Sequence, residues 1–324
     1  MAAVKTLPAD SHRSALGAAL ATLGRENPRM FVLSPDTSRS TGAAVFRDAF
    51  PRQFLCTGVS EMHTLGLAAG LALEGFTPFI VGFGMFVVGK PWEPLRNAIV
   101  YPRLNVKLVA THCGINVGPD GVTHQMTEDL ALTRAIPGLT VFAPADPPQV
   151  LPVLRAALAI DGPVYIRLER DSMRIVTNAD KEVRPGRGQV IRPGSDVALI
   201  AIGGMVGRAM EAAEKLAKTG IDARVINMVS VKPVDNELIA TAARETGALV
   251  TLEDHNRHGG LGSAVAESLA ANLPAPLEQI SLQDTFAESG PAGALYEKYG
   301  LSVEAIMAAA RRALARRGQR KVTS

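Results

Sequence analysis

The stretch that decides the fold runs from residue 57 to residue 129 and reads TGVSEMHTLGLAAGLALEGFTPFIVGFGMFVVGKPWEPLRNAIVYPRLNVKLVATHCGINVGPDGVTHQMTED. Within it, apolar strand-like runs at residues 76–84 and 105–111 alternate with helix-like segments. Strands that alternate with helices are typical of a parallel, doubly wound sheet, because each crossover lays a helix on one sheet face. The stretch therefore predicts an α/β fold.

Glu61 is the unusual residue of this stretch, because it heads a helix that is rich in Leu, Ala and Gly. A helix that is apolar on nearly every side is expected to be largely buried. One interpretation of Glu61 is a first-turn carboxylate favoured by the helix dipole, with Ser60 as the N-cap. The other is a buried carboxylate with a raised pKa that shares a proton with a ligand nitrogen. The segment alone leaves both open.

Two aromatic residues and a histidine stand where strands end. Phe83 and Phe86 are three residues apart, so both can face one side of a turn or helix start. His112 ends the strand at 105–111, and residues at the carboxyl ends of parallel strands face the crevice where ligands bind. Core packing remains the alternative for the phenylalanines, and a surface or satisfied core histidine remains the alternative for His112.

The segments on either side continue the α/β pattern. We expect helices over residues 11–23, near 94–101 and from about Pro147, and strands over 29–36, 139–146 and 164–170. In the last of these strands, Arg167 and Glu169 are expected to face outward.

A second α/β unit follows a region with fading periodicity. From Asp171 to about Pro193, proline and glycine residues mark a linker. Further strands are expected over residues 196–204, 223–233, 248–254 and 277–283, with helices over 206–216, 237–244 and 264–273. The fold class is thus α/β, with two doubly wound, mostly parallel-sheet domains over residues 1–185 and 186–324.

Composition fits an ordinary globular protein. The 324 residues are 47% hydrophobic and 20% charged, and the net charge of +3 is too weak to argue for nucleic acid or membrane binding. The two cysteines, Cys56 and Cys113, predict neither a disulfide framework nor a zinc site and fit a reducing cytoplasm. Residues 1–15 contain no apolar run of signal-peptide length.

Taken together, these segments resemble transketolase, a thiamine diphosphate enzyme, and nearly the whole chain is similar to its C-terminal half. Residues 58–73 resemble the Gly-x-x-Glu segment with its helix, residues 83–86 the aromatic segment, and residues 111–146 the most diagnostic run of the family. Residues 232–235 and 253–269 resemble parts of its C-terminal domain. The resemblance implies a pyrimidine-binding domain followed by a transketolase C-terminal domain.

The resemblance also implies roles for residues that would bind the cofactor. Glu61 resembles the glutamate that bonds N1′ of the aminopyrimidine and drives its imino tautomer. Phe83 and Phe86 resemble the aromatics beside that ring, with Phe86 stacking on it, and Asp36 resembles an aspartate that contacts the cofactor. The family often has a tyrosine where Gly89 stands, which leaves one wall of the pyrimidine pocket undefined.

Six further positions resemble substrate contacts. Three of them would bond sugar hydroxyls and assist proton transfers, namely His112, Asp120 and His124. The other three would hold the phosphate of a sugar phosphate, namely Arg13, Ser40 and Arg170. An arginine fork and a hydroxyl near strand ends suit a phosphate well.

One part of the family's site is missing from this sequence. The diphosphate is held there through Mg²⁺ (or Ca²⁺) by a Gly-Asp-Gly segment in an N-terminal domain, and such an ion needs a dedicated set of oxygen ligands. The Asp-Gly pairs at 120–121 and 161–162 lack that context. We therefore expect no metal ligands here and a separate N-terminal subunit that carries them. The active site would lie at the interface of an α2β2 heterotetramer.

Alternative functions remain open. The β subunit of a 2-oxoacid dehydrogenase E1 component has a similar domain pair, but residues 123–129 and 131–139 and the phosphate-type positions favour transketolase. A subunit that acts on an unusual or sulfonated sugar is a further possibility, and so is a non-catalytic partner that kept the fold. The retained acid and both histidines argue against a non-catalytic role.

Overall fold

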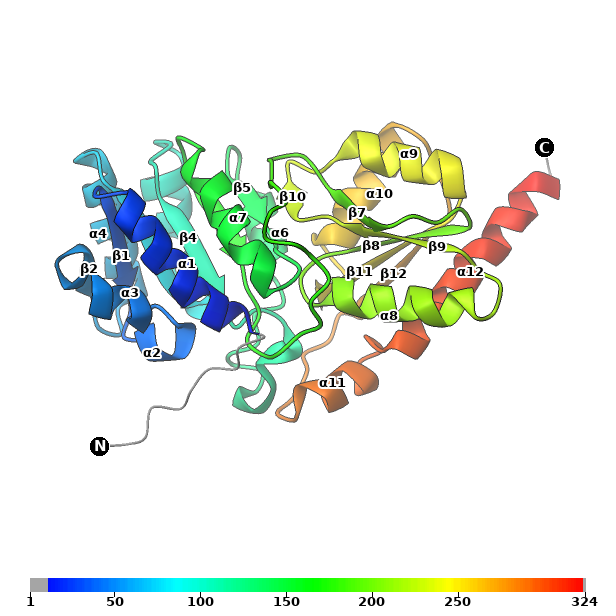
Figure 1. Cartoon of the computed structure of the whole chain (residues 1–324), viewed down its shortest axis with the longest axis horizontal. Coiled ribbons are helices and arrows are strands. Elements are labelled where there is room, and N and C mark those ends of the chain that lie inside the picture. Colours follow the sequence, from blue (N-terminus) through cyan, green and yellow to red (C-terminus); the bar gives the residue numbers. More distant parts are fainter. Residues whose placement is uncertain (1–10, 323–324) are drawn as a thin grey trace.

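A computed structural model of the chain describes residues 11–322, with side chains to residue 317, and contains two sheets that lie side by side (Figure 1). The strand order is β10-β5-β6-β4-β3-β1-β2 in the seven-stranded sheet and β12-β11-β8-β9-β7 in the five-stranded sheet. This confirms the predicted fold class of two mostly parallel α/β units. The domain boundary near residue 185 stays a prediction.

The first unit consists of alternating strands and helices. Its consecutive parallel strands are β1 (Met30–Ser34), β2 (Phe54–Cys56), β3 (Thr77–Phe83), β4 (Lys107–Thr111), β5 (Thr140–Phe142) and β6 (Val164–Arg167). Its α-helices are α1 (His12–Glu26), α2 (Ser38–Thr41), α3 (Ala44–Ala49), α4 (Glu61–Leu73), α5 (Trp92–Pro94), α6 (Asp129–Arg134) and α7 (Pro147–Leu158). Short helices of other types are η1 (Pro51–Gln53), η2 (Met85–Gly89), η3 (Leu95–Val100) and η4 (Ile115–Asp120).

The second unit repeats this plan. Its strands are β7 (Gln189–Arg192), β8 (Val197–Ala201), β9 (Ala223–Asn227), β10 (Ser230–Lys232), β11 (Leu249–Asn256) and β12 (Leu277–Leu282). Its helices are α8 (Met205–Ala217), α9 (Asn236–Thr246), α10 (Leu261–Ala271), α11 (Ala292–Lys298) and α12 (Val303–Val322).

Local sequence explains several of these boundaries. Ser11 caps α1, because its hydroxyl accepts the amide hydrogen of Ser14. Proline at the first position starts α7 at Pro147, where the sequence predicts it. The central strands of the first sheet are buried on both faces, which is why β4 reads as a continuous apolar run apart from Lys107 at its start.

Two segments of the second unit differ from prediction. The end of the expected linker forms β7, which pairs antiparallel with β9 at the sheet edge. The expected strand at residues 223–233 is two strands, because β10 leaves the second sheet and pairs antiparallel with β5 of the first. β10 therefore joins the two units through backbone hydrogen bonds, and it lies between them in Figure 1.

Two burial predictions were wrong, for related reasons. Arg167 and Glu169 are buried rather than outward-facing, because the second unit covers the end of β6 and Arg167 donates to the carbonyl of Asp254. In contrast, α4 is not buried on every side, since Met62 and Leu73 are 54% and 73% exposed. The sequence pattern reports apolar surface but does not say which neighbour covers it.

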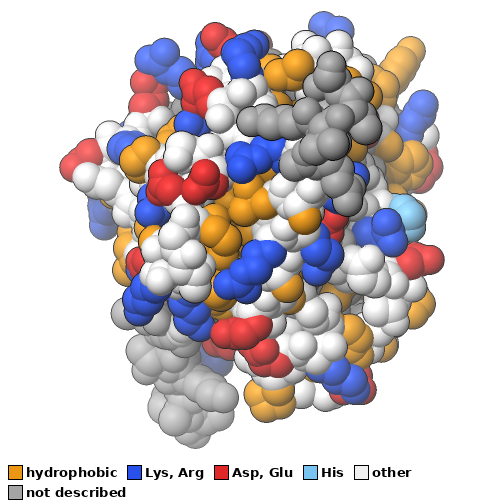
Figure 2. Space-filling model, turned by 90° about the vertical axis from the view of Figure 1, so that its right-hand side faces the viewer, with side chains coloured by type: hydrophobic (Ala, Val, Ile, Leu, Met, Phe, Trp, Pro, Cys, Tyr) orange, Lys and Arg blue, Asp and Glu red, His pale blue; other side chains and the backbone are white. Residues whose placement is uncertain are grey.

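The described helices offer no candidate membrane span, and the face seen in Figure 2 carries charges of both signs. Among residues 11–322, no helix has the length and hydropathy needed to cross a bilayer. Figure 2 looks at the end of the molecule that carries the second unit, where basic and acidic side chains are interspersed around hydrophobic ones.

Candidate active site

The predicted site residues gather at one edge of the first sheet. Strands β6, β4, β3 and β1 are neighbours and parallel, so their carboxyl ends meet at this edge. Four of the predicted residues lie at or just beyond these ends, namely Arg170, His112, Phe83 and Asp36. Asp36 and His112 have positive φ angles of 59° and 60°, an uncommon conformation for residues other than glycine that turns the chain sharply after each strand.

Glu61 is buried and ion-paired. Its side chain is 5% exposed, and Oε2 lies 2.7 Å from Nζ of Lys90, whose side chain is 52% exposed. Ser60 occupies the N-cap position of α4, but its hydroxyl forms no capping bond. Glu61 is therefore a buried, ion-paired acid in the first turn of α4, and its functional role stays a prediction. Lys90 was not singled out from the sequence.

Four rings form a cluster near this acid. The ring centroids of Phe83 and Phe86 are 6.3 Å apart, and those of Phe83 and His112 are 4.0 Å apart. His124 lies perpendicular to Phe86, with a centroid distance of 5.1 Å. Phe86 belongs to η2, whose C-cap residue is Lys90, so the aromatic cluster and the Glu61 carboxylate border the same turn. The structure thus brings these five predicted residues together.

The environment of His112 keeps its imidazole neutral. Burial, followed by the positive charges of Arg13 and Arg170 and by His124, lowers the pKa of His112 to about 2. Its Nδ1 lies 2.9 Å from Oγ1 of Thr111. A neutral imidazole can donate and accept hydrogen bonds, but it does not serve as a cationic acid at neutral pH.

The three predicted phosphate contacts also converge. Nε of Arg13 donates to the carbonyl of Arg170 at 2.8 Å, and Nη1 of Arg13 donates to the carbonyl of Ser40 at 3.1 Å. Arg170 in turn forms an ion pair with Asp120 at 3.3 Å. Burial and the neighbouring guanidinium of Arg170 lower the pKa of Arg13, which reflects two cations held close together. Such a pair suits a dianionic ligand.

Asp36 stands apart from these contacts. Its side chain is exposed, and Oδ1 lies 3.9 Å from Sγ of Cys56. Cys113 is a buried thiol, as expected for a small core residue. Among residues 11–322, no group of three or more His, Cys, Asp or Glu side chains is arranged to hold a metal ion.

The second unit holds the loop that carries the histidines, a feature the sequence did not predict. Asp254 is buried, and its two carboxylate oxygens accept the amide hydrogens of Ile115 and Asn116 at 2.9 and 3.1 Å. Oδ1 of Asn116 then accepts the amide hydrogen of Arg170 at 3.0 Å. Gly114 has a φ of 79°, and a Cβ there would lie 2.2 Å from Asp254 Oδ2. The resemblance of residues 253–269 was the only signal for this role.

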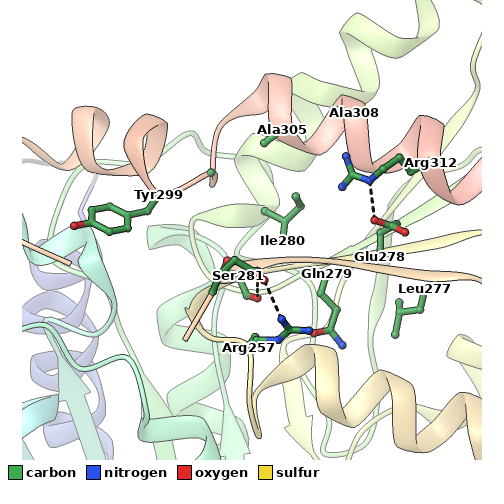
Figure 3. A pocket seen from close by; sticks show the side chains of 12 residues that line it. Arg257, Leu277, Glu278, Gln279, Ile280, Ser281, Tyr299, Ala305, Ala308 and Arg312 are labelled. Atoms are coloured by element: carbon green, nitrogen blue, oxygen red, sulfur yellow. Dashed lines mark hydrogen bonds and ion pairs between the residues drawn. The ribbon is translucent and has the colours of Figure 1, made fainter. Parts of the chain in front are cut away.

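A separate hollow of about 530 Å³ lies along β12 and α12, far from these residues in sequence (Figure 3). Its charged groups are satisfied within the chain, because Arg312 donates to Glu278 at 2.9 Å and Arg257 donates to Gln283 at 3.2 Å. None of the predicted site residues lines it.

The glycine loop at residues 258–262 has a structural role. The amide hydrogens of Leu261 and Gly262, at the start of α10, are bound by the carboxylate of Glu253 at 2.7 and 2.8 Å. A Cβ at Gly260 would lie 2.0 Å from Glu253 Oε2. The helix N-terminus thus already holds an internal anion.

Comparison with known proteins gives a consistent result. Two family models match the chain: transketolase, pyrimidine binding domain, over residues 10–176, and transketolase, C-terminal domain, over residues 186–306. A relative from Methanocaldococcus jannaschii, named for the transketolase C-terminal section, is 42% identical over 297 residues, which cover 91% of this chain and 93% of the relative. A 6-deoxy-6-sulfo-D-fructose transketolase subunit from Clostridium sp. is 38% identical over 286 residues, covering 88% and 89% of the two chains.

A solved structure points the same way. It is described as a split gene transketolase, inactive beta4 tetramer, and is 45% identical with a TM-score of 0.87. The superposition covers 94% of this chain and 98% of that chain. The chain therefore belongs to the transketolase family, of which it comprises the pyrimidine-binding and C-terminal domains.

Proposed function

We propose that this chain is the C-terminal subunit of a thiamine diphosphate-dependent transketolase and transfers a two-carbon ketol unit between sugar phosphates together with a separate N-terminal subunit. The observation that carries the proposal is the convergence of a buried acid, two phenylalanines and two histidines at one sheet edge. Family membership and the relatives that are named as subunits or sections of transketolases support it.

The residues present fit the pyrimidine half of thiamine diphosphate. Glu61 would bond the ring nitrogen, and Phe86, which is only partly buried, would offer a ring face for stacking. Gly89 leaves space beside them, because a Cβ there would make only ordinary contacts with Met85 at 3.5 Å. When bound, the cofactor supplies a stabilised carbanion equivalent for carbon–carbon bond cleavage.

The remaining residues would bind and orient the sugar. Arg13 and Arg170, with Ser40, would hold the terminal anionic group. His112, neutral in its buried position, would exchange hydrogen bonds with sugar hydroxyls, and His124 would assist proton transfer at the more open side of the cluster. Asp120, paired with Arg170, would fix the substrate's orientation. Asp36 would contact the cofactor from the end of β1.

A partner chain would complete the site. We propose that the N-terminal subunit carries the Gly-Asp-Gly segment, which binds the diphosphate through Mg²⁺ or Ca²⁺, and that the assembly is an α2β2 complex in the cytoplasm. The exposed apolar face of α4, the helix that Glu61 begins, supports a docking surface beside the acid. A solved structure of 45% identity is described as the inactive beta4 tetramer of a split gene transketolase, which is consistent with partner dependence.

The test is reconstitution. We expect the mixture of the two chains, with thiamine diphosphate and Mg²⁺, to convert a ketose phosphate and an aldose phosphate. Either chain alone should show no such activity. A mixture that processes a branched 2-oxoacid instead would favour a 2-oxoacid dehydrogenase subunit. A mixture that binds no thiamine diphosphate would favour a non-catalytic partner.

A second substrate class has specific support. A 38% identical relative is named for a sulfonated ketose, and an arginine pair can bind a sulfonate as well as a phosphate. Competition between a ketose phosphate and a 6-sulfonated ketose in the reconstituted assay distinguishes the two, since the preferred substrate has the higher kcat/KM.

A further inference from the structure

We propose that Lys90 is a positioning residue for Glu61. It binds one carboxylate oxygen and thereby fixes the other toward the pyrimidine nitrogen of the cofactor. This inference rests on the function proposed above, and it adds a residue that neither the family resemblance nor the sequence pattern assigned. Its basis is the 2.7 Å contact between Lys90 Nζ and Glu61 Oε2.

The burial of the two partners is unequal, and this explains what the contact does. Glu61 has lost most of its hydration, because its side chain is 5% exposed, and an unpaired carboxylate at that depth is strongly disfavoured. Lys90 remains 52% exposed, so its ammonium keeps much of its water while it neutralises the acid. The pair therefore avoids most of the desolvation penalty of a fully buried ion pair.

The contact also leaves one oxygen of the acid available. Lys90 occupies Oε2, and no donor within residues 11–322 bonds Oε1. A carboxylate that is held by one oxygen has its other oxygen fixed in direction, which is what a single bond to a ring nitrogen requires. The role of Lys90 is thus geometric as well as electrostatic.

The same turn positions the acid and the stacking ring. Lys90 is the C-cap residue of η2, and its backbone amide donates to the carbonyl of Met85 at 3.3 Å. Phe86 lies within the same turn. A π-type turn is uncommon and is found preferentially at functional sites. Because η2 carries Phe86 and its C-cap residue is the cation that holds Glu61, movement of this turn would displace the ring and the acid together.

The opposite role can be stated and tested. The Lys90 ammonium could instead occupy the position that the ring nitrogen would take beside Glu61. It would then block cofactor binding until the partner subunit docks. Removing the ammonium would then strengthen cofactor binding, whereas removal of a positioning residue weakens it.

The experiment measures the Kd of thiamine diphosphate for the reconstituted two-subunit complex by calorimetry, with Mg²⁺ present. We expect Lys90→Met to raise the Kd by about tenfold, the effect of one charge-assisted hydrogen bond. Lys90→Arg should restore binding to within about threefold of the wild type, because the charge and the donor are retained. Lys218→Met, which removes an exposed lysine on the other unit, is the matched control and should leave the Kd unchanged.

A double-mutant cycle shows whether Lys90 acts through Glu61. In a Glu61→Gln background, Lys90→Met should change the Kd by less than about twofold, since the ion pair is already absent. This double variant removes both charges and so leaves no unpaired buried ion.

Tighter binding by Lys90→Met, or an unchanged Kd, would overturn the positioning role. Failure of the wild-type complex to bind the cofactor would instead overturn the proposed function, so the two failures are distinguishable.

Discussion

At the scale of single residues, the site depends on side chains whose surroundings set different charge states. Glu61 is buried beside a cation, whereas His112 is buried beside two cations. Burial and the two neighbouring cations favour the neutral form of the His112 imidazole, whereas Glu61 has a cation as its hydrogen-bond partner. Arg13 and Arg170 add to the effect of burial on the pKa of His112, and the same two cations are the proposed contacts for an anionic group.

Arg13 provides a residue-scale prediction about substrate binding. Arg13→Gln should raise KM for a ketose phosphate by about tenfold or more, because a charge-assisted, forked contact to the anionic group is lost. The kcat/KM for a ketose without the phosphate should change by less than about threefold. Steady-state kinetics with the matched pair of substrates checks this, and equal losses for both substrates would contradict a phosphate-binding role.

Glu169 provides a prediction about stability. Burial, reinforced by the negative charge of Asp254, raises the pKa of Glu169 from 4.5 to about 7. Between these pH values the folded chain holds a proton that the unfolded chain has released, so this group destabilises the fold as pH rises through that window. Glu169→Gln lacks this titration.

The free energy of unfolding of Glu169→Gln, relative to the wild type, should therefore increase by about 3 kcal/mol between pH 4.5 and roughly pH 8. Urea unfolding at a series of pH values measures the difference. A difference that stays constant with pH would show that Glu169 does not titrate in this window.

These residues also show what the sequence can and cannot predict. Glu61, Phe83 and His112 could be placed because the ends of parallel strands must meet at one edge. Arg167 and Glu169 could not be placed correctly, since their burial depends on the second unit, more than 30 residues further along the chain. Lys90 gave no signal because a lysine after a glycine is ordinary until the fold brings it to an acid.

At the scale of elements, the loop between β4 and α6 depends on β11 of the other unit. Asp254 bonds the backbone of Ile115 and Asn116, and Tyr296 donates to Asp254 at 2.9 Å. Asn116 passes this restraint to Arg170 through its side-chain oxygen. We infer that the second unit holds His112, Asp120 and Arg170 in their positions relative to one another, although it contributes none of the predicted site residues.

Asp254→Asn tests this restraint. The amide would place hydrogens against the donors of Asn116 and Tyr296, so the chain should lose about 1–3 kcal/mol of stability. Amide hydrogen exchange of residues 113–121 should increase more than that of the first-sheet strands. Asp180→Asn, at an exposed position, is the matched control, and loop exchange that rises no more than in the control would contradict the inference.

Element boundaries could be predicted where a local signal exists, such as the proline that begins α7. The partition of residues 223–233 into β9 and β10 could not, because the pairing of β10 with β5 is a long-range contact. The exposure of one face of α4 could not be predicted either. An apolar helix has the same composition whether its apolar face packs within this chain or against another chain.

At the scale of the whole molecule, the account requires that the apolar face of α4 meets the N-terminal subunit. Met62→Asp should weaken association with that subunit by at least about a hundredfold, since a charge would be buried without a partner. The isolated chain should fold as before, because Met62 is exposed in it. Phe286→Asp, at a position that is 74% exposed on the second unit, is the control in sedimentation velocity experiments. Undiminished association of Met62→Asp would place the interface elsewhere.

The central claim is that Glu61 performs chemistry on a cofactor shared between two chains. Its most direct test is the turnover of a ketose phosphate by the reconstituted pair in which Glu61 is replaced by alanine. The account predicts a loss of at least about a hundredfold in kcat, because the group that exchanges a proton with the pyrimidine is removed. A loss of less than about tenfold would contradict it.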